Sequence, residues 1–67
     1  MSWNLEGMRV VGMYMGDIAV SGTVNLSRVV CGGGVSHHVA LDNPINVYGA
    51  IRDRVILEDQ YIAKVLG

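Results

Sequence analysis

The stretch from Ser27 to Asp42, SRVVCGGGVSHHVALD, holds most of the side chains in this sequence that could do chemistry. A zinc site here would draw on Cys31, His37 and Asp42, but structural zinc requires four convergent ligands. His37 and His38 are neighbours in a predicted strand, so they point to opposite faces and cannot easily bind one metal together. We therefore predict no metal and no other cofactor, and we expect His37 to lie at one end of the core.

Sequence patterns typical of enzymes are absent. No GxSxG, HExxH, CxxC or Walker sequence occurs. Ser27 and His38 would be neighbours on adjacent strands, but no acid orients the pair, so the arrangement for a nucleophile is incomplete. We expect a protein that is not an enzyme; the alternative left open is a site assembled at the axis of a symmetric oligomer.

The elements that must position these residues are strands. Apolar residues occupy the even positions from Ile18 to Val30 except Gly22 and Arg28, and this alternation is typical of a half-buried strand. Glycines 32–34 supply the conformations that a tight turn needs, and with 31–34 as the loop Val30 would face Val35 and Leu26 would face Val39. The glycines therefore predict a hairpin rather than a phosphate-binding loop.

Further strands are predicted on both sides of this hairpin. A first strand covers about 8–15, and the sequence YMGDI turns it onto the second. A turn at 42–44 leads to a strand at 45–48, and a turn in AIRD leads to a strand in RVILE. The tail 59–66 is compatible with either a helical turn or an edge strand.

Five short strands in meander order predict an all-β fold, a single small five-stranded antiparallel barrel occupying one domain, 1–67. The segments SGTVNLSRV, HHVALD and INVYGAIRDRVIL resemble the two-segment pattern of Sm-like and SH3-like barrels. The Met-Asn of the first Sm segment is absent, and the Arg-Gly of the second is here Tyr48-Gly49. The chain is also similar to short proteins of tailed phages.

Composition and charge narrow the class of protein. The formal net charge is −1, which does not favour a nucleic-acid or membrane-surface role. No uncharged run is long enough to span a bilayer, and the sequence start lacks the pattern of a signal peptide. Cys31 is the only cysteine, which excludes an internal disulfide and favours a reducing compartment. We expect a cytoplasmic protein, in the host cytoplasm if a phage encodes it.

Five residues are candidates for contact with a ligand. The predicted registers align Ser27, His38 and Tyr48 in one row on the face away from the core, where an imidazole and a phenol could stack a base. Arg52 and Arg54 flank Asp53 and could hold phosphates. These residues carry the alternative function, a single-stranded nucleic-acid (RNA) binding barrel of Sm or OB type. A solvated sheet face and a local Arg–Asp pair are the competing interpretations.

The first strand is apolar on both faces, although a barrel has one interior. The surplus face is covered either by Trp3 and Leu5 or by another subunit. Coverage by another subunit is favoured, because the chain has only 67 residues, is 51% hydrophobic and has no disulfide to stabilise a small core. We therefore predict a non-catalytic binding or assembly module that forms a homo-oligomer, with a protein partner as a further option. The candidate interface residues are Met8, Val10, Met13, Tyr14 and Met15.

Overall fold

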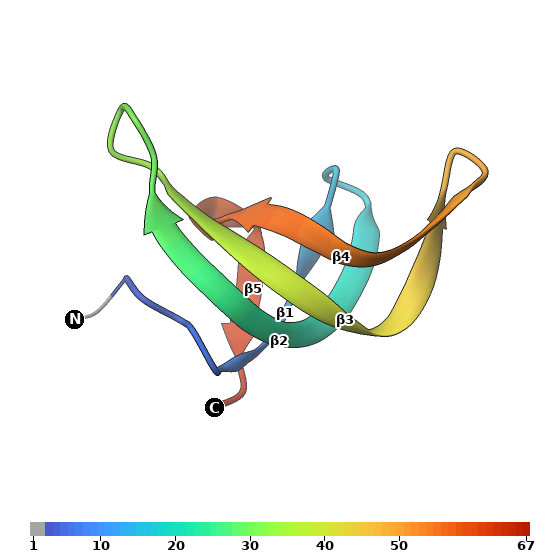
Figure 1. The fold of residues 1–67 in the computed structure, drawn as a ribbon, viewed down its shortest axis with the longest axis horizontal. Helices are drawn as coiled ribbons and strands as arrows, with labels where there is room; N and C mark the ends of the chain where they lie inside the picture. Colours follow the sequence, from blue (N-terminus) through green and yellow to red (C-terminus); the bar gives the residue numbers. More distant parts are fainter. Residues whose placement is uncertain (1–2) are drawn as a thin grey trace.

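One antiparallel sheet of five strands makes up most of the protein in a computed structural model that describes residues 3–67 (Figure 1). The elements are β1 (Arg9–Tyr14), β2 (Ile18–Val29), β3 (Val35–Val47), β4 (Ala50–Glu58), a short 3₁₀ helix η1 (Asp59–Tyr61) and β5 (Ile62–Val65). The strand order is β4-β3-β2-β1-β5. The prediction of an all-β fold with five antiparallel strands is confirmed. The tail contains both a helical turn and an edge strand.

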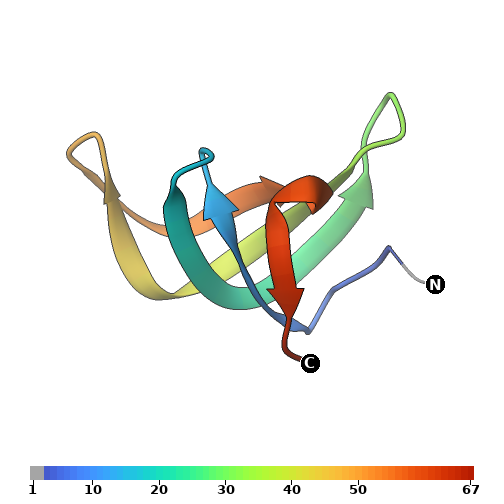
Figure 2. The same ribbon diagram turned by 180° about the vertical axis from the view of Figure 1, so that it is seen from behind.

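The sheet does not close into the predicted barrel. The long strands β2, β3 and β4 curve so that β1 and β5 lie behind β4, as the front and back views show (Figures 1 and 2). β4 and β5 are the two ends of the strand order, so they are not hydrogen-bonded to each other. The chain passes from one to the other through η1. The result is an open, strongly curved sheet with two edges.

A small core fills the inside of this curve. Its buried members are almost all valines, the side chains best suited to a pleated surface. They are Val10, Val20, Val24, Val39, Val47, Val55 and Leu57. Leu5 packs against this cluster from the N-terminal segment, as does Ile62 from β5. Leu5 thus covers an end of the core, while Trp3 remains exposed.

A bulge in β2 changes which side chains face the core. The pairing of β2 with β3 shifts register between Val24 and Leu26, where one extra residue is accommodated. Before this point the even-numbered residues are buried, and after it Ser27 is buried while Leu26 is exposed. The predicted pairing of Leu26 with Val39 is therefore wrong, and Leu26 instead faces His38. The bulge adds one residue to the strand and so moves every later residue to the other face. A prediction that continues the period-two alternation past this point therefore assigns the later residues to the wrong face.

β3 is longer than the sequence predicted. The turn expected at 42–44 does not form, and β3 continues through Pro44 to Val47. The ladder with β4 is interrupted between Ala40 and Ile45, so proline, which has no N–H to donate, lies where the ladder is already broken. The chain reverses at Tyr48 and Gly49, both with positive φ, as a two-residue type I′ hairpin requires. The turn predicted in AIRD is likewise wrong, because that segment is inside β4.

An ion pair holds the bend in β3 against β1. The Arg9 guanidinium donates two hydrogen bonds to the Asp42 carboxylate, at 2.6 and 3.2 Å, and the Ser21 hydroxyl donates a third at 3.3 Å. The hydrogen bonds from Arg9 hold the pKa of Asp42 below its ordinary value. Asp42 therefore contributes stability that is present above its unfolded-state pKa of about 3.9 and is lost as the pH falls through its lower folded-state value.

Asp42→Asn is expected to lower the melting temperature slightly at neutral pH, because the pair is exposed to solvent. The gap between the variant and the unmodified chain should begin to narrow as the pH falls below about 4, where the carboxyl of the unfolded chain takes up a proton, and should close at lower pH, where the folded chain does so as well. Thermal melts between pH 7 and 3 measure this gap. A gap that stays constant over the whole range would show that the charge of Asp42 does not matter.

Within residues 3–67, no helix has the length and apolar character needed to cross a membrane.

Candidate functional site

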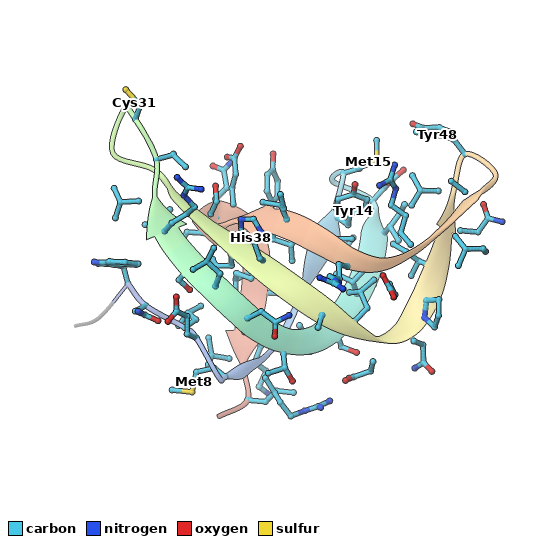
Figure 3. The ribbon with its side chains drawn as sticks, in the orientation of Figure 1. Met8, Tyr14, Met15, Cys31, His38 and Tyr48 are labelled. Atoms are coloured by element: carbon cyan, nitrogen blue, oxygen red, sulfur yellow. The ribbon has the colours of Figure 1, made fainter. Side chains whose placement is uncertain are left out.

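A groove of about 420 Å³ is the main concave feature associated with the predicted ligand residues. Its size lies within the range of small-ligand pockets. We call it the β4 groove, because four of its lining residues come from that strand. It is lined by Tyr14, Asn25, Leu26, His38, Val39, Arg52, Arg54, Val55 and Ile56. His38 lies near the middle of the sheet in Figure 3, and Tyr14 lies at the end of β1.

The structure brings three of the five predicted ligand residues together. His38, Arg52 and Arg54 all line the β4 groove. Tyr48 lies at the tip of the β3–β4 hairpin, is 92% exposed and does not line it (Figure 3). Ser27 is 4% exposed and belongs to the core side of β2. The predicted row of Ser27, His38 and Tyr48 therefore does not exist. Ser27 pairs with His37 instead of His38, and Tyr48 follows directly on β3, the strand that contains His38, instead of lying on a strand paired with it.

The groove carries an excess of positive charge. Arg52 and Arg54 are the charged residues among its lining, and no carboxylate contributes to it. Within residues 3–67 neither arginine forms an ion pair or a side-chain hydrogen bond, so the expected local pair with Asp53 is absent. Two guanidinium groups are thus left available to an anion, although the chain as a whole carries a net charge of −1.

An apolar row crosses the groove beside the arginines. Leu26, His38 and Ile56 are directly opposite one another on β2, β3 and β4. Leu26 and Ile56 are both exposed, and His38 lies between them in the row. The imidazole between them therefore sits in an apolar strip that could contact the flat face of a ligand.

A separate polar network lies inside the molecule and was missed from the sequence. Ser27 Oγ is 2.8 Å from Nδ1 of His37, and Nε2 of His37 is 2.9 Å from Oδ1 of Asp59. The backbone N–H of Leu5 donates to Ser27 Oγ at 3.0 Å, and the N–H of Ser27 donates to Glu6 Oε2 at 3.0 Å. The network joins the N-terminal segment to β2, β3 and η1.

One proton arrangement satisfies every group in this chain of hydrogen bonds. The Ser27 hydroxyl accepts from Leu5 and donates to Nδ1 of His37, whose Nε2–H then donates to Asp59. This arrangement uses a neutral imidazole. No buried side-chain nitrogen or oxygen among the described residues lacks a partner. The bulge explains the pairing, because it turns Ser27 inward to face His37 across the β2–β3 ladder.

A serine, a histidine and an aspartate joined by hydrogen bonds invite comparison with hydrolases. A catalytic serine must present its hydroxyl to a substrate. Here Ser27 is 4% exposed, His37 is 0% exposed, and neither residue lines the β4 groove. The hydroxyl already accepts a hydrogen bond from Leu5, so the network as it stands links parts of the fold and offers no open side to a substrate.

The predicted interface residues do not form one surface. Met8 and Met15 are exposed but lie at opposite ends of β1 (Figure 3). Met13 and Tyr14 are half-buried, and Val10 is 1% exposed in the core. β1 is hydrogen-bonded to β2 on one side and to β5 on the other, so it has no free edge for pairing with a second copy. Association through β1 itself is therefore restricted to its exposed ends.

The β2–β3 loop holds the remaining chemistry-bearing residue. Cys31 is exposed at the tip of this loop (Figure 3) and lines a second hollow with the loop glycines and η1. In the part of the chain that the structure describes, no three His, Cys, Asp or Glu side chains are grouped to hold a metal. Both ring nitrogens of His37 are already hydrogen-bonded, one to Ser27 and the other to Asp59.

Comparison with known proteins adds no relative. No protein-family model matches the chain, and no match is found among curated proteins or among solved structures. The fold and the groove geometry therefore carry the functional argument.

Proposed function

We propose that this protein is a non-catalytic binding module that associates with copies of itself. The observation that carries the proposal is the contrast between a core of seven buried apolar side chains and twelve large apolar side chains left exposed among the described residues. The side chains with catalytic potential, Ser27 and His37, are meanwhile buried. A domain of this size gains stability when a partner covers such surface.

The arrangement of the strands also supports the predicted SH3-like character. β5 returns beside β1, and a single 3₁₀ turn separates it from β4. SH3-like and related small barrels serve many unrelated functions, so this likeness of architecture does not identify a ligand. The function has to be argued from the exposed surfaces.

Strand pairing through the free edges is less favourable than side-chain packing. β4 carries Arg52, Asp53 and Arg54 along its edge, and β5 is four residues long and contains Lys64. Charges and short length are the devices by which edge strands avoid pairing with other chains. We therefore place the contact between copies on exposed apolar side chains.

Such side chains lie close together at one end of the β1–β5 pair, where β1 begins and β5 ends. Met8, Val65 and Leu66 are exposed, and the N–H of Leu66 donates to the carbonyl of Arg9, next to Met8, at 2.7 Å. We call these three residues the terminal apolar surface. It retains one residue of the predicted interface, Met8, and adds two from β5 and the C-terminal segment.

Light scattering after gel filtration at micromolar concentration tests the proposal. The unmodified chain is expected to have a mass of at least twice the 7.2 kDa of one chain. The double variant Met8→Lys/Leu66→Lys should be monomeric, because charges at a packed interface must lose their hydration. Ile51→Lys, at an exposed position near the far hairpin, is the control and should leave the mass unchanged.

The outcomes separate the two parts of the proposal. A monomeric unmodified chain would refute self-association. An oligomer that both variants leave intact would place the interface elsewhere and overturn the assignment of the terminal apolar surface. Circular dichroism of each variant shows whether its fold is retained.

A further inference from the structure

We propose that the β4 groove binds single-stranded nucleic acid, with Arg52 and Arg54 on the phosphates and a base against the row formed by Leu26, His38 and Ile56. The proposal deepens the binding function proposed above by naming a ligand class. It uses a surface distinct from the terminal apolar surface, so the two can be tested independently.

The arginines provide the first argument. Arg52 and Arg54 are two residues apart in one strand, which places their Cα atoms roughly 6.6 Å apart on the same side of β4. A repeat of this kind suits an extended phosphate backbone, which presents negative charges at regular intervals. Both guanidinium groups are free of internal partners, as described above, so binding would not have to break an ion pair.

The distribution of acidic groups provides the second argument. Asp42 is bound to Arg9, Asp59 accepts from His37, and Glu6 accepts from the N–H of Ser27. None of these carboxylates lines the groove. Asp53 lies between the two arginines on β4 but does not line the groove either, so the groove lining itself carries two positive charges and no negative one.

The apolar row provides the third argument and favours a single strand over free phosphate or a duplex. An inorganic phosphate would use the arginines and leave Leu26 and Ile56 in water. A duplex keeps the faces of its bases stacked on one another, whereas a single strand can place a base on protein side chains. Tyr14 and His38 supply ring systems at the groove, and the Asn25 amide can donate to or accept from a base edge.

Fluorescence anisotropy with a labelled oligouridine of about ten nucleotides, at about 50 mM salt, tests the proposal. The unmodified chain should bind, and Arg52→Ala/Arg54→Ala should weaken binding at least about tenfold. The slope of log affinity against log salt should fall in magnitude by about 1.4, since each phosphate contact to a single strand contributes about 0.7.

A matched control removes the same charge elsewhere. Arg28 and Lys64 are exposed and do not line the groove. Arg28→Ala/Lys64→Ala should therefore bind with nearly unchanged affinity and salt slope. His38→Ala and Ile56→Ser should weaken binding without changing the salt slope, because these residues contact the base and not the phosphates.

Several results would overturn the proposal. These are the absence of binding at low salt, an equal loss in the two double variants, or equally tight binding of inorganic phosphate or duplex RNA. Equal binding of polyglutamate would identify a general polyanion surface and reject nucleic acid as the ligand. Light scattering on the same samples reports self-association separately, so a monomer that binds RNA would refute only the assembly proposal.

Discussion

Gly22→Ala should remove most of the stability of the protein. Gly22 lies in the middle of β2, between Val10 on β1 and Leu41 on β3. A Cβ at this position would overlap the carbonyl oxygen of Ala40 and come within 2.9 Å of the Leu41 Cα. These are backbone atoms of a neighbouring strand, which cannot move without breaking the sheet. We expect a loss of ~3 kcal/mol or more, against a total of roughly 3–10 kcal/mol for a chain of this length.

Gly34→Ala is the control for this prediction. The nearest atom to its added Cβ is the end of the flexible Val30 side chain at 3.4 Å, an ordinary contact. Its melting temperature should stay close to that of the unmodified chain. Thermal circular dichroism measures both variants. Equal melting temperatures for Gly22→Ala and Gly34→Ala would show that β2 and β3 are not packed as described.

His37→Ala should destabilise the protein far more than His38→Ala. The His37 ring is fully buried, and its loss would leave a cavity and an unpaired Ser27 hydroxyl. A cost of ~3 kcal/mol is expected from these two effects together. The neighbouring His38 ring is half-buried on the other face, so its loss should cost less than about 1 kcal/mol.

Chemical denaturation of the two variants measures the difference. Ser27→Ala gives an independent check, because it leaves the Leu5 N–H and Nδ1 of His37 without partners and should cost ~1–3 kcal/mol. If His37→Ala and His38→Ala are equally stable, the buried network does not contribute as the structure indicates.

The strand content and several turns could be predicted from the sequence because they depend on local patterns. The apolar alternation around Val20 and Val24 predicts a strand, and glycines 32–34 predict a turn. The first strand was predicted close to its true bounds. These features follow from the period-two geometry of a strand and from the conformational freedom of glycine.

The registers could not be predicted, because each is set by a bulge that the sequence does not mark. The extra residue near Asn25 reverses the faces of Leu26 and Ser27, and the interruption between Ala40 and Ile45 lets β3 pass through Pro44. A bulge is favoured by the packing of the whole sheet rather than by one residue type. The partners predicted between β2 and β3 were wrong for this reason, whereas those predicted across a turn at 42–44 were wrong because 35–47 form one continuous strand.

The same cause explains which site residues were found. Arg52, Arg54 and His38 were among the predicted ligand residues, and the structure places all three in the lining of the β4 groove. The partnership of Ser27 with His37 and Asp59 depends on the bulge and on the path of η1, so it was missed. The sequence feature that pointed to this surface was the spacing of Arg52 and Arg54, which are two positions apart and therefore lie on the same face of a strand.

In the proposed self-association, another copy of the chain covers the exposed apolar side chains Met8, Val65 and Leu66 at one end of the β1–β5 pair. Hydrogen–deuterium exchange of the unmodified protein, compared at dilute and concentrated conditions, tests it without any substitution. Amides at Met8 and 62–67 should exchange more slowly as the protein concentration rises, while the hairpin at 48–51 should exchange at a constant rate. Exchange at Met8 and 62–67 that does not depend on concentration would contradict the claim.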